Sequence, residues 1–180
     1  SEEHLRVVLS LLEDVSASLR AAVHAVLGCI PLTSPSCLYL AIKALQDNIR
    51  RHPSDTPNIF KSLSRLGKLC SGLAEDVTPR LLVVRNSVGQ ESPYVTLHPD
   101  AEDDTYVAIL VLVFSAAAIN PQVLAMVPGH SVRHWRYLRH KYSSLIPTIE
   151  IASVGNQMLE FRDLLSDLAP VATSDGAHDG

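Results

Sequence analysis

The chain has 180 residues, the length of about one domain, which is enough to bury a core without disulfide or metal staples. Hydrophobic residues make up 47% and charged residues only 19%, which excludes intrinsic disorder and favours an apolar surface that meets a partner. The formal net charge of −4 excludes a protein that is basic throughout but permits a local cationic patch.

The first 73 residues carry the signals of three helices. Apolar residues recur every three or four positions over 5–27, which predicts one long helix that stops at Gly28. Ser34 before Pro35 is a helix start signal, and the apolar stripe that follows runs on toward Pro53. Thr56 and Pro57 repeat this start signal, and the helical period continues over 59–73.

The pattern changes after this segment, because short β-favouring runs separated by Asn, Gly and Pro predict a small hairpin over 81–97. Helices are predicted again over 106–119, after Pro121, over 131–142 and over 148–168. We therefore expect a mainly α fold, a single-domain helical bundle over 1–168, with a flexible C-terminal tail over 169–180.

Cysteine usage and targeting signals indicate the compartment. Cys29, Cys37 and Cys70 are odd in number and lack CxxC spacing, which fits reduced thiols inside a cell. The N-terminal residues show no secretory signal, and the most apolar run, 106–119, is shorter than the roughly 20 residues of a membrane span. We expect an intracellular protein, in the cytoplasm or nucleus of a host cell, without a membrane partner.

Catalytic and metal-binding signatures are absent from the sequence, which has no nucleophile elbow, phosphate loop or HExxH motif. His130 and His134 are spaced for one helical face, but nothing nearby completes a metal site. The acidic cluster over 100–104 is better explained as a helix-capping turn than as a cation site. The prediction is a non-enzymatic protein without catalytic residues, metal or cofactor.

The most unusual feature is a basic segment inside the stretch between Asp104 and Glu150, which contains no acidic residue. Cations there alternate with aromatic side chains, a combination typical of proteins that bind single-stranded nucleic acid. The predicted nucleic-acid-binding residues are Arg133, Arg136, Arg139, Lys141, Trp135 and Tyr137. In the alternative, the cations form a solvated face or pair with acids elsewhere, while Trp135 and Leu138 anchor the helix in the core.

A second cationic set spans the second and third predicted helices. Its members are Arg50, Arg51, His52, Lys61, Arg65 and Lys68. They either extend the binding surface or compensate helix dipoles, and the second explanation is the more ordinary one.

Two stretches resemble the coat proteins of rod-shaped plant viruses, the tobamovirus and benyvirus group. The first is the apolar helix from Asp104 that leads into Asn120-Pro121, and the second places Arg139 ahead of a Phe161 near the C-terminus. The resemblance implies a right-angled bundle of four main helices with a small sheet, lateral self-assembly, and arginines that hold RNA phosphates. Arg139 is the one arginine in a matched position.

These observations support two main hypotheses. The leading one is a self-assembling structural protein, a viral coat or nucleocapsid subunit that binds copies of itself and single-stranded RNA, with the virion as a further location. The alternative is an intracellular adaptor whose helical groove receives a helix of a partner protein, with the basic segment as a docking rim. An enzyme without a recognisable motif is the least favoured.

Overall fold

The computed structural model describes residues 2–82 and 101–149, and all regular structure in these ranges is helical. The mainly α prediction is therefore confirmed. The α-helices are α1 (Glu2–Ser10), α2 (Ala17–Leu27), α3 (Pro35–Arg51), α4 (Thr56–Leu69), α5 (Ser71–Leu82), α6 (Asp104–Ala117), α7 (Pro121–Ala125) and α8 (Gly129–Lys141). Two 3₁₀-helices, η1 (Leu11–Glu13) and η2 (Pro53–Asp55), link α1 to α2 and α3 to α4.

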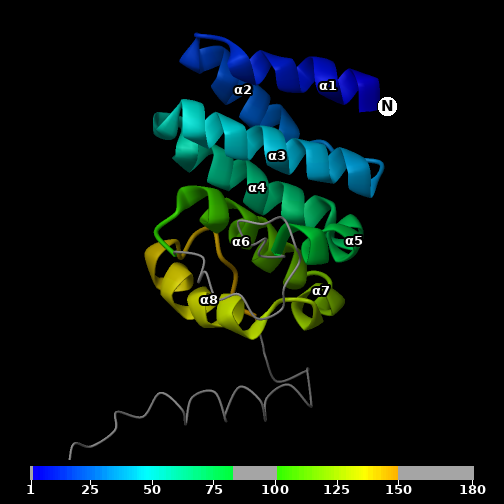
Figure 1. The fold of residues 1–180 in the computed structure, drawn as a ribbon, viewed down its shortest axis with the longest axis vertical. Helices are drawn as coiled ribbons and strands as arrows, with labels where there is room; N and C mark the ends of the chain where they lie inside the picture. Colours follow the sequence, from blue (N-terminus) through cyan, green and yellow to red (C-terminus); the bar gives the residue numbers. More distant parts are fainter. Residues whose placement is uncertain (1, 83–100, 150–180) are drawn as a thin grey trace, which may run out of the picture. The chain divides into compact units, whose positions relative to one another are not determined.

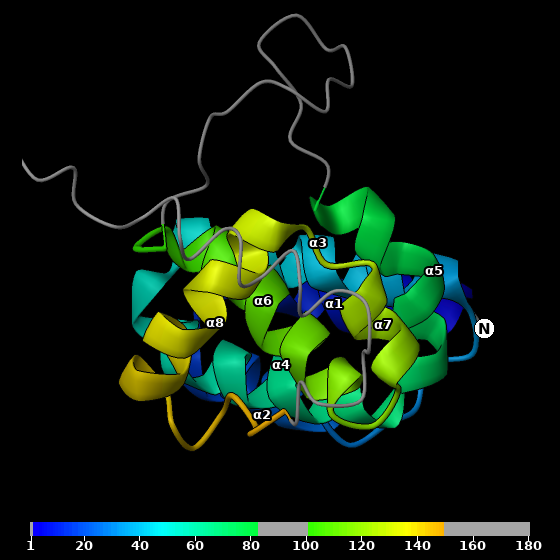
Figure 2. The ribbon, with the colours of Figure 1, turned by 90° about the horizontal axis from the view of Figure 1, so that it is seen from below.

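The helices are stacked in successive pairs (Figure 1). The odd-numbered helices contact one another in order, α1 on α3, α3 on α5 and α5 on α7, and the even-numbered helices do the same from α2 to α8. Seen from below, α3 and α5 lie on one side, and α2 and α4 lie on the other (Figure 2). This is the arrangement of helix pairs in α-solenoids, where each layer packs mainly on its neighbours.

The first helix predicted over 5–27 is divided in two. The backbone of Asp14 is extended, and its carboxylate accepts a hydrogen bond from the amide of Ser16 at 2.7 Å. The Ser16 hydroxyl in turn caps α2 by accepting from the amide of Leu19 at 3.4 Å. An Asx turn followed by an N-cap thus divides the helix, although the apolar period of the sequence runs on through this point.

The predicted hairpin begins inside a helix. Helix α4 ends at Leu69, and α5 begins at Ser71 and runs to Leu82. Leu81 and Leu82 are therefore buried helical residues and not strand residues. The remainder of the hairpin, 83–97, lies outside the described residues. Apolar runs as short as this one fit a buried helix turn as well as a strand, which explains the error.

Ser1–Ile149 form one compact unit. The helix predicted over 148–168 is not helical at 148–149, and the remainder lies outside the described residues. The domain boundary at residue 168 and the tail over 169–180 stay predictions.

The core is centred on α6, in which every residue from Tyr106 to Ala117 is buried. Its closest contact is with α4 at Gly67, where a Cβ atom would lie 2.3 Å from the carbonyl oxygen of Leu112. Next to this crossing, the hydroxyl of Ser115 donates to that of Ser64 at 3.0 Å. Small side chains therefore bring the two helix backbones together.

A buried polar network joins the first two layers. The guanidinium of Arg20 donates to both carboxylate oxygens of Asp55, at 2.6 and 3.3 Å, and both side chains are less than a tenth exposed. Asn48 lies between this pair and His24, whose Nε2 is 2.6 Å from the Asn48 amide oxygen. The hydrogen bond from Arg20 holds the pKa of Asp55 below its ordinary value, and burial lowers the pKa of His24.

Candidate protein-binding surface

The structure places the predicted nucleic-acid-binding residues on α8, which is anchored by the fully buried Leu138. Five of the six, Arg133, Arg136, Tyr137, Arg139 and Lys141, are exposed, and Trp135 is half-buried. Four of them take part in two separate sets of intramolecular contacts, and the predicted role of the six in binding nucleic acid stays a prediction.

The first set centres on Glu102, just ahead of α6. The ammonium of Lys141 lies 2.5 Å from the Glu102 carboxylate, and the hydroxyl of Tyr137 donates to the same carboxylate. These hydrogen bonds, first of all the one from Lys141, hold the pKa of Glu102 below its ordinary value, and the Glu102 bond raises the pKa of Tyr137. Lys141 and Tyr137, two residues of the predicted site, thus connect α8 to the turn before α6.

The second set joins α8 to the segment that follows it. The guanidinium of Arg139 lies 5.7 Å from the centre of the Trp135 ring and donates to the hydroxyl of Thr148 at 2.6 Å. The indole nitrogen of Trp135 donates to the carbonyl of Pro147 at 3.4 Å. These contacts link Trp135 and Arg139 to the segment that follows α8.

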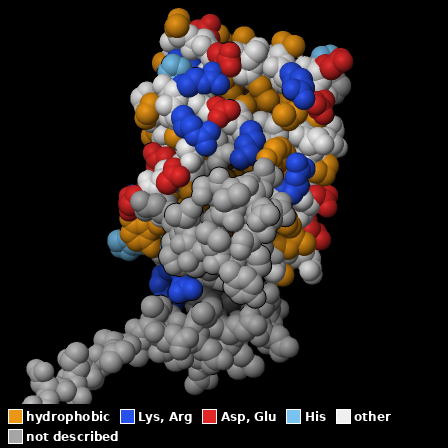
Figure 3. All heavy atoms as spheres, in the orientation of Figure 1, with side chains coloured by type: hydrophobic (Ala, Val, Ile, Leu, Met, Phe, Trp, Pro, Cys, Tyr) orange, Lys and Arg blue, Asp and Glu red, His pale blue; other side chains and the backbone are white. Residues whose placement is uncertain are grey.

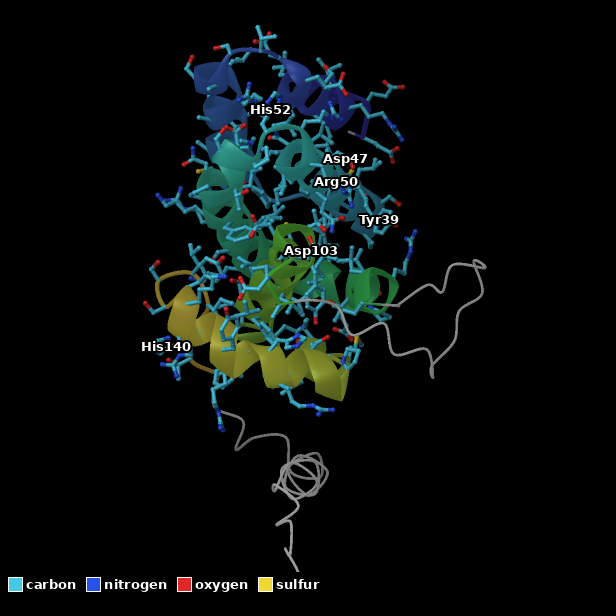
Figure 4. The ribbon with its side chains drawn as sticks, turned by 60° about the vertical axis from the view of Figure 1, so that its left-hand side comes forward. Tyr39, Asp47, Arg50, His52, Asp103 and His140 are labelled. Carbon is cyan, nitrogen blue, oxygen red and sulfur yellow. The ribbon has the colours of Figure 1, made fainter. Side chains whose placement is uncertain are left out.

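Arg133 and Arg136 are the two remaining cations, and neither forms an ion pair with a described residue. They fall on one face of α8 with the exposed His140, which Figure 4 shows on α8. Trp135, Leu138 and Lys141 thus make contacts within the fold, and Arg133, Arg136 and His140 form a small exposed face of α8.

The acidic turn before α6 caps the helix, as the sequence predicts. The carboxylate of Asp103 accepts from the amide and the hydroxyl of Thr105, both at 2.8 Å. In residues 2–82 and 101–149, no group of three or more His, Cys, Asp or Glu side chains is placed to hold a metal. His134 contacts the hydroxyl of Tyr106 at 3.2 Å, which is a contact within the fold.

The second cationic set divides into two parts with different surroundings. Arg50 pairs with Asp47 at 2.6 Å along α3, as Figure 4 shows, and Arg51 pairs with Glu13 of η1 at 3.0 Å. These pairs account for the α3 cations as local charge compensation. The cations of α4 are all exposed and have no acidic partner in the described part of the chain; they are Lys61, Arg65 and Lys68.

The largest group of exposed apolar side chains lies on the first helix layer. The described residues expose nine large hydrophobic side chains, and five belong to this layer: Val7 (66%), Leu11 (40%), Val15 (94%), Val26 (42%) and Ile30 (49%). We call these five residues the end patch. Figure 3 shows hydrophobic side chains on this end of the molecule, interspersed with charged ones.

The geometry of α1 explains the position of the patch. Arg6, Leu9 and Ser10 line a hollow shared with α3, so this face of α1 is directed at the next layer. Val7 lies on another face of α1, and Leu11, the first residue of η1, follows it four residues later. The apolar residues of α1 are therefore present on two faces, of which the stack covers one.

A second hollow of about 210 Å³ opens beside the end patch. Val26 and Ile30 line its rim, and Leu5, Val8 and Leu27 contribute further apolar walls. A hollow of this size and lining suits one or two apolar side chains of a partner helix. The end patch and this hollow together form the best candidate for a protein-binding surface.

Sequence patterns missed this surface because the residues of the patch follow the helical period of the buried stripe. Val15 and Val26 belong to the apolar series over 5–27 that predicts a core-facing helix. The signal that could have revealed them is the width of the apolar face, since residues 7, 8, 11 and 12 are all apolar and one layer cannot cover them all. No sequence signal relates Arg20 to Asp55.

The predicted compartment rests on the cysteines and on the length of the apolar helices. All three cysteines are free; Cys37 and Cys70 are buried, and Cys29 is exposed. Among the described helices, none combines the length and apolarity that a bilayer crossing requires.

Comparison with known proteins gives relatives of one kind, although no protein-family model matches the chain. The chain is 36% identical over 154 residues to Integrator complex subunit 4 of Xenopus laevis, a match that covers 85% of the chain. It is 34% identical over 151 residues to the Homo sapiens protein of that name, and 29% identical over 155 residues to the Drosophila melanogaster protein.

These matches overturn the resemblance to plant-virus coats, and with it the coat-protein, self-assembly and virion predictions. The motifs that carried the resemblance have local explanations. The apolar helix is the buried α6, and Asn120 ahead of Pro121 is the N-cap of α7, where its side chain accepts from the amide of Gln122 at 3.1 Å. Each of the matched vertebrate and insect relatives is much longer, and the chain is similar to a segment that makes up 15% of Integrator complex subunit 4.

Proposed function

We propose that this chain is a non-enzymatic docking module, in which the end patch receives an amphipathic helix of a partner protein. The observation that carries the proposal is the exposure of five large apolar side chains on one end layer, three of them more than 45% exposed. Five large apolar side chains exposed on one layer of helices favour burial of this surface against further protein.

The shape of the surface favours a helix as the occupant. Val7 of α1 and Leu11 of η1 are four residues apart, and the hollow opens between α1, the end of α2 and the start of α3. A helix laid along this layer would contact Val7 and Leu11 and insert an apolar side chain between Val26 and Ile30. The apolar interior of the hollow supplies affinity, and the rim residue His4 lies at its polar edge.

The relatives give an independent reason to expect a protein partner, because their printed name is that of a subunit of a complex. The proposal includes an intracellular location, which the free thiols and the relatives both favour. The absence of a catalytic role belongs to the proposal as well.

The test is co-purification of the tagged full chain with the other Integrator subunits from the cells that produce it. Glutamate is introduced at two exposed patch positions, Val7→Glu and Val15→Glu, where it leaves the core untouched. Ile119→Glu is the matched control, because Ile119 is 61% exposed but lies outside the end layer. We expect the patch variant to lose the other subunits while its melting temperature and the control's binding stay at the wild-type level.

Two results would overturn the proposal. In the first, the patch variant retains the other subunits as fully as the wild type does. In the second, light scattering shows that the purified chain self-associates through the patch, so that a second copy and not a different protein is the occupant.

A further inference from the structure

We infer that the exposed face of α4 binds an acidic segment of a partner protein through three cations. Lys61, Arg65 and Lys68, which we call the α4 stripe, are spaced four and three residues apart. At this spacing they lie on one face of the helix over about 10 Å. All three are exposed, and the described residues supply no carboxylate to any of them.

The surroundings of the α4 stripe contain very few acids. The helices α2, α4 and α8 have no acidic residue, and neither does the segment 142–149. This segment lies against α4, because Ser64 donates to the carbonyl of Leu145 at 3.0 Å and the rings of Phe60 and Tyr142 make an edge-to-face contact. Figure 2 shows α2 and α4 together on one side of the stack.

Among the elements that contact α4, η2 and α6 each contribute one acid, and each of these two acids has a role within the fold. Asp55 of η2 is buried against Arg20 at 2.6 Å, and Asp104 begins α6 at its N-terminal end, where it faces the helix dipole. The odd-numbered helices α1 and α3 instead carry charged side chains of both signs: Arg6 pairs with Glu2 on α1, and Arg50 pairs with Asp47 on α3. Within residues 2–82 and 101–149, this side of the stack is therefore electropositive and has no acidic partner for the α4 stripe, although the chain as a whole is acidic.

A protein is the better occupant than a nucleic acid for two reasons. The face of α4 offers no exposed aromatic ring, since Phe60 is buried, and stacking platforms are what single-stranded nucleic acids require. Leu69 is 48% exposed one turn beyond Arg65, so the surface combines three cations with an apolar neighbour. A helix with carboxylates on one edge and an apolar residue beside them matches both features.

The test uses a synthetic helical peptide with three glutamates spaced four and three residues apart and a leucine one turn beyond the central glutamate. Its partner in the experiment is the full chain, and binding is measured by fluorescence anisotropy at several salt concentrations. The same peptide with glutamines in place of the glutamates is the peptide control. Zero-length carbodiimide crosslinking then identifies the lysines that contact peptide carboxylates.

We expect the stripe variant Lys61→Gln, Arg65→Gln, Lys68→Gln to bind roughly tenfold more weakly, because three exposed ion pairs each contribute modestly. The matched variant Lys43→Gln, Arg50→Gln, Arg80→Gln removes the same charge from other exposed positions and should bind like the wild type. Crosslinks should form at Lys61 and Lys68 and not at Lys43.

Three results would overturn the inference: equal weakening in both variants, equal binding of the glutamine peptide, or binding of a single-stranded RNA of matched charge in preference to the acidic peptide. The inference concerns a different surface from the end patch. Its failure in this assay is therefore distinguishable from failure of the proposed docking function.

Discussion

The substitution Gly67→Ala tests the close approach of α4 and α6 at Gly67. The added Cβ would lie 2.3 Å from the carbonyl oxygen of Leu112 and 3.2 Å from the amide nitrogen of Ala116. Both are backbone atoms of α6, so no change of rotamer relieves the overlap. The helices α4 and α6 must move apart, and the fully buried side chains on either side of the crossing must move with them.

The geometry sets the size of the effect. Ordinary contact at 3.4 Å or more requires the helices to separate by about 1 Å, which forfeits a quarter to a half of the dispersion energy of the affected contacts. Overpacking of this kind costs about 1–3 kcal/mol, and the upper end applies because the obstacle is backbone. Against this loss, the higher helix propensity of alanine relative to glycine stabilises the variant by about 1 kcal/mol. The expected net loss is about 2 kcal/mol in the free energy of unfolding, or roughly 4–8 °C in melting temperature.

Urea unfolding followed by circular dichroism at the helix band measures this loss. Gly72→Ala is the matched control, because a Cβ at Gly72 in α5 meets nothing within 4 Å. The control should be neutral or gain stability through helix propensity, so the two variants should move in opposite directions. A Gly67→Ala protein as stable as the wild type would refute the argument that backbone contact at this crossing determines the packing of the core.

Two further predictions concern the buried polar network. Because burial lowers the pKa of His24, the unfolded state takes up a proton first as the pH falls below about 6.5. The free energy of unfolding should therefore fall with decreasing pH by up to about 1.4 kcal/mol per unit, and His24→Gln should flatten this dependence in urea titrations. Asp55→Asn leaves Arg20 buried without a carboxylate, so it should lower the melting temperature far more than Asp47→Asn at an exposed pair; equal losses would contradict the assignment of a buried pair.

Local start signals and apolar periodicity predicted most helices of this fold from the sequence. Ser34 caps α3 by accepting from the amide of Cys37 at 3.2 Å, and Pro35 stands at its first turn, as the pattern indicates. The break between α1 and α2 was missed because it depends on Asp14 and Ser16, which also fit a helix surface. Periodicity places residues on faces, and polar side chains that close a turn leave the period unchanged.

The order of the helices in space could not be predicted from the sequence. The helices differ in length, from five residues in α7 to 17 in α3, so stacking produces no repeat period that a sequence would display. For the same reason, the sequence does not show that the α4 stripe lies on a side of the stack with few acids. That distribution of charge is apparent only once alternate helices are known to share a side. The cations of α8 were conspicuous in sequence because they are adjacent, yet two of them contact Glu102 and Thr148.

The stacked arrangement makes a final prediction about local stability, because a layer that packs on one neighbour opens more easily than a layer packed on two. The helix α1 buries only Leu5 and contacts chiefly η1 and α3, whereas α6 buries every residue from Tyr106 to Ala117. In native-state hydrogen exchange, the amides of α1 should exchange by local opening at a small fraction of the global free energy of unfolding. Those of α6 should exchange only by global unfolding. If the end patch receives a partner helix, protection should rise in α1 on binding and stay unchanged in α6. Equal protection of both helices in the free chain would contradict the argument that the layer with fewer buried contacts opens more easily.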